Sequence, residues 1–366
     1  MAIKFGFDFF DSLVGTTDAD VLIARGGDDI VIGDHGRDWL DGGPGGDLLV
    51  GGRVVPSSLN EAEFFDHDDD VLIGGLGDDT LVSVGGRDII DGGEGEEVDQ
   101  GDFVVVSRPD HPTALKVFGR DAPRLPAAIE LLDGQAIVVS DGTIVVNVEN
   151  LTFRGTVGSD RVLLANVTSL DTAVIRGNAG GDVIITDRSV DSLFGDAGDD
   201  YLAAGAEDDS LEGGPGDDTA RGGAGDDVIL GGRGDDLLNG GRGDDEVYGD
   251  GGDDTLVGGA GNDTLGGAGP FAPQNVFDTD VMTGNGGADH FLLIFGAMNE
   301  DVITDFTRAQ GDTIEIQFGI GVDRQDVEIA VADRRAGLFE VTVDGEGTHT
   351  FTAEGATLFD LDLSFF

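Results

Sequence analysis

Ten aspartates recur every nine residues in the second half of the chain, and no repeat is missed between residues 177 and 266. They are Asp182, Asp191, Asp200, Asp209, Asp218, Asp227, Asp236, Asp245, Asp254 and Asp263. Each occupies position six of a nonapeptide G-G-x-G-x-D-x-U-x, in which U is apolar, and GGAGDDVIL at 222–230 is a clean copy. A strict internal period of this kind is typical of a solenoid. A solenoid would stack these carboxylates in rows, and such rows require cations to hold them together.

The same repeat occurs earlier in the chain and, after a gap, once more near its end. An N-terminal block begins at Gly15, is interrupted by residues 51–64 and decays near Glu97, where GGEGEEVDQ loses both the aspartate and the apolar residue. After residue 266 the sequence slips by eight residues before two more copies follow. The position-six residues of these copies are Asp20, Asp29, Asp38, Asp47, Asp70, Asp79, Asp88, Asp280 and Asp289. We interpret all nineteen aspartates as candidate metal ligands.

One nonapeptide shows why a cation is needed. Its first six residues are mostly Gly and Asp, which favour tight turns, and its last three are expected to be extended. Side chains alternate along a strand, so only the apolar residue at position eight would point inward. One small apolar side chain in every nine residues makes a thin core. Another interaction must therefore stabilise the turns.

Calcium is the simplest ion for this purpose. It accepts six to eight oxygen ligands from carboxylates and backbone carbonyls in flexible geometry, whereas Mg²⁺ demands a stricter octahedron. Zn²⁺ prefers His or Cys, of which the chain has five and none. If strands alternate between two faces, turns eighteen residues apart share an edge, and n turns give n − 2 sites. The ten turns of the long block would then hold eight ions, and eight turns in the N-terminal region would hold six if residues 51–64 are only a looped-out insertion. These fourteen ions would offset 28 of the 54 net negative charges.

Composition excludes several classes of function. The net charge of −54 leaves no basic patch for nucleic acid or for an anionic membrane surface. No Cys is present, so disulfides and thiol nucleophiles are excluded, and no apolar run is long enough to span a membrane. The N-terminal residues lack the pattern of a cleaved signal peptide. No HExxH or G-x-S-x-G motif occurs, and the five His residues are scattered singly.

The register suggests four segments. Residues 1–100 would form an N-terminal β-roll with the 51–64 insertion, and residues 101–154 a strand and loop linker. Residues 155–292 would form the main β-roll, and residues 293–366 a β-rich cap. Phe residues gather at both ends of the chain, between residues 5 and 10 and beyond residue 266. We therefore expect conventional aromatic cores at the ends of an all-β, calcium-stabilised parallel β-roll.

These nonapeptides resemble the RTX (repeat-in-toxin) calcium-binding repeat. The resemblance implies a parallel β-roll with calcium in the turns, which folds outside the cell where calcium is abundant. GNGGADHFL, DVITDF and GDTIEI look like the C-terminal module of serralysin-type secreted metalloproteases, although no protease domain accompanies them. The final LFDLDLSFF is similar to the uncleaved signals read by the bacterial type I secretion apparatus. The resemblance thus implies a bacterial protein that is secreted or held at the cell surface.

Two functions remain open at this level. The first is a non-enzymatic, calcium-dependent extracellular protein, such as a matrix, surface-layer or adhesion component that contacts polysaccharide or other copies of itself. The second is a secreted enzyme or toxin with chemistry in residues 101–154 or 293–366. Those segments are short, strand-like and poor in His and Lys, which favours the first function.

Overall fold

In the computed structural model of this chain, most strands pair in parallel with the strand eighteen residues later in the repeats. The structure describes residues 1–52, 70–76, 79–83, 88–93, 103–107, 116–118, 136–139, 144–146, 150–155, 158–164, 170–269, 278–294, 300–318, 327–333, 338–343, 347–353, 356–357 and 361–365. The 51–64 insertion, the 101–154 segment and the LFDLDLSFF segment lie partly or largely outside these residues.

The described residues divide into two compact units. The N-terminal unit comprises residues 1–179 and 183–191, and the C-terminal unit comprises residues 180–182 and 192–366. Every regular element assigned within the described residues is a β-strand, which confirms the predicted fold class. In these same residues, no helix has the length and apolar character that crossing a bilayer requires.

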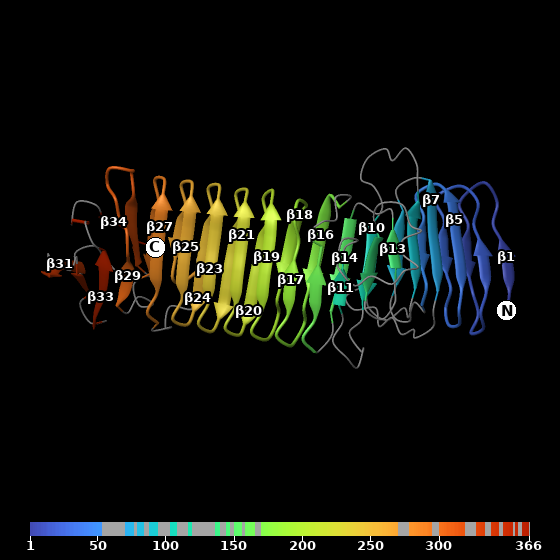
Figure 1. Cartoon of the computed structure of the whole chain (residues 1–366), viewed down its shortest axis with the longest axis horizontal. Coiled ribbons are helices and arrows are strands. Elements are labelled where there is room, and N and C mark those ends of the chain that lie inside the picture. The colour runs from blue at the N-terminus through green and yellow to red at the C-terminus, as the bar shows by residue number, and fades with distance from the viewer. Residues whose placement is uncertain are drawn as a thin grey trace. The chain divides into compact units, whose positions relative to one another are not determined.

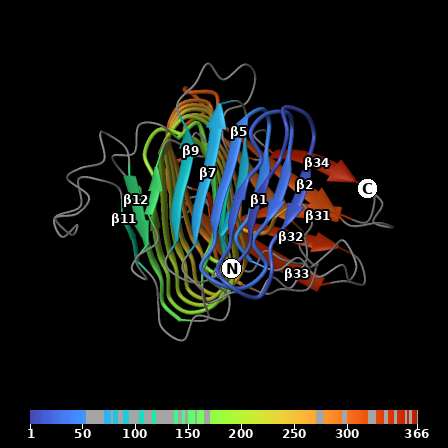
Figure 2. The same cartoon turned by 90° about the vertical axis from the view of Figure 1, so that its right-hand side faces the viewer.

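Two parallel sheets form most of the N-terminal unit, and consecutive strands of the repeats alternate between them. The first sheet contains β1 (Ile3–Phe5), β3 (Val21–Ile23), β5 (Trp39–Pro44), β7 (Val71–Leu76), β9 (Ile89–Gly93), β11 (Lys116–Phe118), β12 (Ala136–Val139), β13 (Ile144–Val146), β15 (Arg161–Leu163) and β17 (Val183–Ile185). The second contains β2 (Ser12–Val14), β4 (Ile30–Ile32), β6 (Leu48–Val50), β8 (Thr80–Ser83), β10 (Phe103–Ser107), β14 (Asn150–Arg154) and β16 (Thr172–Arg176). Figure 2 shows β5, β7 and β9 side by side, as their pairing requires.

The C-terminal unit repeats this alternation with greater regularity. One sheet contains β19 (Tyr201–Ala206), β21 (Thr219–Ala224), β23 (Leu237–Arg242), β25 (Thr255–Ala260), β27 (Val281–Gly286), β29 (Asp301–Ile303), β31 (Val327–Asp333), β32 (Leu338–Val343) and β33 (Gly347–Ala353). The other contains β20 (Ser210–Pro215), β22 (Val228–Arg233), β24 (Glu246–Gly251), β26 (Thr264–Gly266), β28 (His290–Ile294), β30 (Thr313–Phe318) and β34 (Leu361–Phe365), while β18 (Val190–Phe194) contributes residues to both units. The strands from β19 to β27 form a regular ladder (Figure 1).

Pairing between strands confirms that turns eighteen residues apart share an edge. Ile229 of β22 pairs with Leu211 of β20 and with Val247 of β24, all in parallel register. The register also survives the irregular segments. Trp39 pairs with Val71 across the 51–64 insertion, and Thr255 pairs with Val281 across the slip that follows residue 266.

Strands in the middle of the C-terminal unit are longer than the sequence indicated. The expected strand covered positions seven to nine, but β22 runs over six residues, Val228–Arg233, and so includes the first three residues of the next repeat. The Gly-Gly pair that was expected to turn is therefore part of the strand. Gly232 has a φ of 118° and still pairs with Gly214, because a residue without a Cβ tolerates this conformation inside the ladder. Only positions four to six form the turn.

Position eight supplies the core, as predicted. Leu22, Leu40, Ile229, Leu238 and Leu256 are completely buried, and every other described position-eight residue of the repeats from Asp20 to Asp88 and from Asp182 to Asp289 is buried as well. The aromatic core expected at the C-terminal end is also present. It includes Phe291, Phe306, Phe318, Phe339 and Phe351, and the last two rings stack with centroids 4.9 Å apart.

The aromatic core expected at the N-terminal end does not form. Phe5, Phe7, Phe9 and Phe10 are 55–64% exposed. For Phe5 the reason is local, because Lys4 takes the inward position that pairs with Leu22, so the flanking side chains of β1 face outward. Lys4 donates from Nζ to the carbonyl oxygen of Val14. The first strands therefore leave an apolar, aromatic-rich surface.

Parallel pairing also continues past Glu97, where the sequence suggested that the N-terminal roll ends. β8 pairs with β10, β10 with β14, and β14 with β16, all in parallel. In the other sheet β9 pairs with β13, and β11 with β15. Parts of the 101–154 segment thus extend the sheets of the N-terminal unit. The four predicted segment boundaries remain a prediction.

Candidate metal centre

All nineteen predicted position-six aspartates are buried in the structure, at 3% exposure or less. Except for Asp191, which lies within β18, each of these aspartates directly precedes the strand that places position eight in the core. In most of them the backbone N–H donates to Oδ1 of the aspartate one full turn later along the same edge. Asp209 donates to Asp227 at 2.9 Å, and Asp227 to Asp245 at 2.9 Å.

These hydrogen bonds form continuous rows within each unit. In the N-terminal unit they join Asp20 to Asp38, Asp29 to Asp47, Asp38 to Asp70, Asp47 to Asp79 and Asp70 to Asp88. In the C-terminal unit they join Asp182 to Asp200, Asp200 to Asp218, Asp218 to Asp236, Asp236 to Asp254, Asp245 to Asp263, Asp254 to Asp280 and Asp263 to Asp289. Asp191 instead accepts the N–H of Ala173 at 3.1 Å. The structure therefore brings nearly all of the predicted residues together in rows.

The second carboxylate oxygen, Oδ2, is the chemically informative atom. In nine of these residues Oδ2 is buried and has no hydrogen-bond partner within the described part of the chain. They are Asp29, Asp47, Asp200, Asp218, Asp227, Asp236, Asp245, Asp254 and Asp263. A buried carboxylate oxygen without a donor is costly, since the charged group has lost its water. The regular recurrence of this cost indicates that a cation completes the turns.

The surroundings of Oδ2 fit a cation that binds oxygen. A Cβ built on Gly213, at position one, would lie 2.6 Å from the carbonyl oxygen of Gly231 and closer still to Oδ2 of Asp218. The same convergence of a carboxylate and a carbonyl oxygen occurs at Gly195, Gly231 and Gly249. Position one is therefore Gly because a side chain would occupy the space on which these oxygens converge.

Calcium suits this set of oxygens. Among the described residues, no group of three or more His, Cys, Asp or Glu side chains gathers as a metal cluster. The position-six carboxylates and the carbonyls of the Gly-rich turns would therefore hold the ion together, a combination that a flexible, oxygen-binding cation accepts. When bound, such an ion supplies positive charge to the turns and joins neighbouring turns along an edge.

The raised pKa values of the buried carboxyls in the C-terminal unit also indicate negative charge that the protein does not compensate. Burial, and secondarily the neighbouring carboxylates, raise the pKa of Asp200, Asp236 and Asp263 to about 7. The pKa of Asp254 rises to about 9, since its carboxylate is buried close to Asp280. In the N-terminal unit burial raises the pKa of Asp47 to about 6.

The sequence analysis did not predict a second row of aspartates, at position five of the repeats. Position-five aspartates are exposed, and their Oδ1 atoms accept the N–H of the residue eighteen positions later, which reverses the direction of the position-six row. Asp226 thus accepts from Asp244 and donates to Asp208, both at 2.8 Å. The doubled acid of GDD is the signal that could have revealed this row. It explains why Asp is so frequent at both positions.

The position-six row also extends further than predicted. Asp280 donates its N–H to Oδ1 of Asp301, and Asp289 donates to Oδ1 of Asp312. Both acceptors are buried, as is Asp160 in the N-terminal unit. DVI at 301–303 and DTI at 312–314 retain the D-x-U half of the repeat without its Gly-rich half.

Replacing Asp227 by Ala tests the row directly. The change removes one ligand oxygen and leaves the N–H of Asp209 without its acceptor. We expect fewer bound calcium ions and faster hydrogen exchange around residues 209, 227 and 245, with little effect in the N-terminal unit, because a solenoid transmits strain mainly to neighbouring turns. Asp226→Ala serves as the control, since it removes an exposed carboxylate. Equal loss of protection in both units would contradict the model of local coupling.

The raised pKa values also set a pH dependence. Carboxyls whose folded pKa lies near 6 or 7 rather than 3.8 favour the folded state at low pH, and that contribution is lost as pH rises through the folded value. The calcium-free C-terminal unit should therefore be more stable at pH 5 than at pH 8. With calcium the sign reverses, because protons compete for the same oxygens. Circular dichroism between pH 5 and pH 8, with chelator and with calcium, measures how stability changes with pH in each condition. A stability in chelator that rises with pH would contradict the prediction for the calcium-free unit.

Comparison with known sequences agrees with this site. A family model described as the RTX calcium-binding nonapeptide repeat matches residues 5–40, 26–53, 68–96, 176–211, 204–238 and 230–265. No curated protein sequence matches the chain at a significant level. The matched ranges contain position-six aspartates of both units, which confirms the resemblance in the repeats. The chain therefore carries RTX calcium-binding nonapeptide repeats that fold as a parallel β-solenoid.

Proposed function

We propose that this chain is a secreted, non-enzymatic structural protein that folds outside the cell when calcium binds its repeats. In this role it is a component of a matrix, a surface layer or an adhesion assembly. The observation that carries the proposal is the set of buried Oδ2 atoms that lack hydrogen-bond donors. A chain with these turns is poorly stabilised where calcium is scarce, as in a bacterial cytoplasm, and well stabilised where it is plentiful.

Export before folding follows from the same requirement. A chain that remains expanded without calcium can pass through a narrow export channel and fold on the far side. The similarity of LFDLDLSFF to signals for the type I apparatus supports this route. The similarity of residues 284–316 to the serralysin-type C-terminal module supports it as well.

Surface features favour contact with other macromolecules. The position-five acids of the C-terminal unit, from Asp199 to Asp253, are exposed along the turn edges. Calcium ions shared with an acidic polysaccharide would bridge two such anionic surfaces. The exposed Phe7 and Phe9 rings stack with centroids 5.5 Å apart, and they favour association with another apolar surface. Both features support a role in assembly.

An enzymatic function is the alternative, and one surface contact favours it. His290 places Nδ1 2.9 Å from Oγ1 of Thr313, and Nε2 3.2 Å from Oε2 of Glu315. A hydroxyl, an imidazole and a carboxylate in sequence are the components of a nucleophilic hydrolase site. The three residues stand on adjacent β-strands, β28 and β30, where cross-strand polar contacts also stabilise a sheet. We therefore favour the structural role.

The purified chain should be largely disordered in chelator and become β-rich as calcium approaches roughly millimolar concentration. The calcium-loaded protein should sediment as assemblies, or bind acidic polysaccharide, and should show no hydrolase activity. A folded β-roll in chelator, measured by circular dichroism, would falsify calcium-driven folding. Turnover that disappears in His290→Ala would instead establish the enzymatic alternative.

Deletion of residues 357–366 tests the export proposal. We expect the truncated chain to stay inside a type I secreting host while the purified protein binds calcium as before. Measurement of the secreted fraction, with calcium titration of the purified chain as control, separates the two effects. Normal export of the truncated chain would reject the signal assignment.

A further inference from the structure

Two position-six aspartates of the N-terminal unit, Asp20 and Asp88, contrast with Asp29 and Asp47 in how Oδ2 is satisfied. Elsewhere in the unit, Oδ2 of Asp29 and of Asp47 is buried without a hydrogen bond. In Asp20 and in Asp88, the same oxygen accepts a hydrogen bond from a hydroxyl of the protein itself. The donors are Thr16 and Ser83 respectively.

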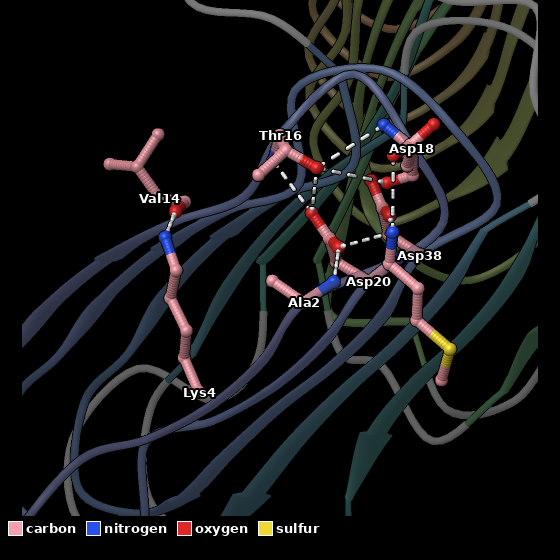
Figure 3. A network of polar contacts seen from close by, with 8 residues as sticks. Ala2, Lys4, Val14, Thr16, Asp18, Asp20 and Asp38 are labelled. Atoms are coloured by element: carbon pink, nitrogen blue, oxygen red, sulfur yellow. Dashed lines mark hydrogen bonds and ion pairs between the residues drawn. The ribbon is translucent and has the colours of Figure 1, made fainter.

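Both carboxylate oxygens of Asp20 accept hydrogen bonds from the protein (Figure 3). Thr16 donates to Oδ2 twice, from its backbone N–H at 2.6 Å and from Oγ1 at 2.8 Å. Oδ1 accepts the N–H of Ala2 and lies 3.9 Å from the amino group of Met1. Both oxygens of this carboxylate therefore have partners, and a positive charge stands nearby.

The carboxylate of Asp20 has also turned away from the space at position one. A Cβ built on Gly15 would lie 3.1 Å from Oδ2 of Asp20, whereas at Gly42 the corresponding oxygen of Asp47 is much closer.

The carboxylate of Asp88 gains a donor by another route. Ser83 stands at position one, where the repeat normally has Gly, and it is buried. Its side chain occupies the space on which oxygens converge in the other turns, and its Oγ donates to Oδ2 of Asp88. Ala24 gives the comparison, because it also stands buried at position one and leaves Oδ2 of Asp29 without a donor. The hydroxyl, and not the Cβ, satisfies the carboxylate.

We propose that hydroxyls take the place of calcium at two carboxylates of the N-terminal unit, that of Thr16 at Asp20 and that of Ser83 at Asp88. The inference rests on the proposed calcium-driven folding. It removes Asp20 and Asp88 from the set of calcium ligands. It also means that these two turns order at lower calcium than the Gly-rich turns of the C-terminal unit, and serve as starting points for folding of their unit.

Hydrogen exchange of the full chain at a series of buffered calcium concentrations tests the proposal. Segments 15–23 and 83–91 should gain protection at a lower calcium concentration than segment 213–239. Thr16→Val should raise the calcium midpoint of segment 15–23 by about tenfold, because it removes a hydrogen bond to a charged group. Ser83→Ala, which reproduces the arrangement at Ala24, should do the same for segment 83–91. Thr17→Val, at an exposed neighbour in the first turn, should change neither midpoint.

The possible results distinguish failure of calcium-driven folding from failure of the hydroxyl-held turns. If segment 213–239 is protected without calcium, the proposed calcium-driven folding fails. If that segment responds to calcium but 15–23 and 83–91 share its midpoint, or the hydroxyl-deleting variants leave their midpoints unchanged, the hydroxyl-held turns are refuted. A variant segment that stays unprotected at every calcium concentration, beside a normal segment 213–239, supports the requirement for the hydroxyl.

Discussion

This fold depends on buried aspartate carboxylates in which one oxygen accepts a hydrogen bond and the other has no donor. Oδ1 of most position-six aspartates accepts a backbone N–H from the preceding turn on its edge, which fixes the register of the ladder. Oδ2 faces the turn without a donor in nine of them. The backbone therefore brings the charge into place but does not compensate it, and folding becomes conditional on a cation. Regular geometry and calcium dependence have the same origin.

The glycines follow from this arrangement. Position one lacks a side chain because a carboxylate and a carbonyl oxygen converge there, as at Gly213. Where Ser83 replaces Gly, a hydroxyl enters that space and the carboxylate gains a donor. At Asp88 the residue at position one thus supplies the donor, whereas at Asp20 the donor is Thr16 at position two. A single-residue choice, repeated along the chain, sets how the demand for calcium is distributed.

The sequence predicted the periodic part of the structure well, because period and geometry coincide there. Asp227 and Ile229 could be placed in the turn and the core from spacing alone. Strand length was wrong because Gly232 looks like a turn residue, although it pairs within a parallel ladder. The N-terminal Phe residues were misplaced because Lys4 takes the inward position, and composition does not show which residue faces the core. Asp301 and Asp312 were missed because their repeats keep only the D-x-U half.

The distribution of partners also explains why the position-six aspartates are not equivalent. Asp20 and Asp47 carry the same residue type at the same repeat position, but burial without a donor raises one pKa and hydrogen bonds lower the other. Only residues several positions away, such as Thr16, make the difference. A count of repeats therefore gives an upper bound on the number of calcium ions. If hydroxyls replace calcium at Asp20 and Asp88, as proposed, the number of bound ions depends on how many turns leave Oδ2 without a protein donor, and so on the hydroxyls around each turn as well as on the aspartates.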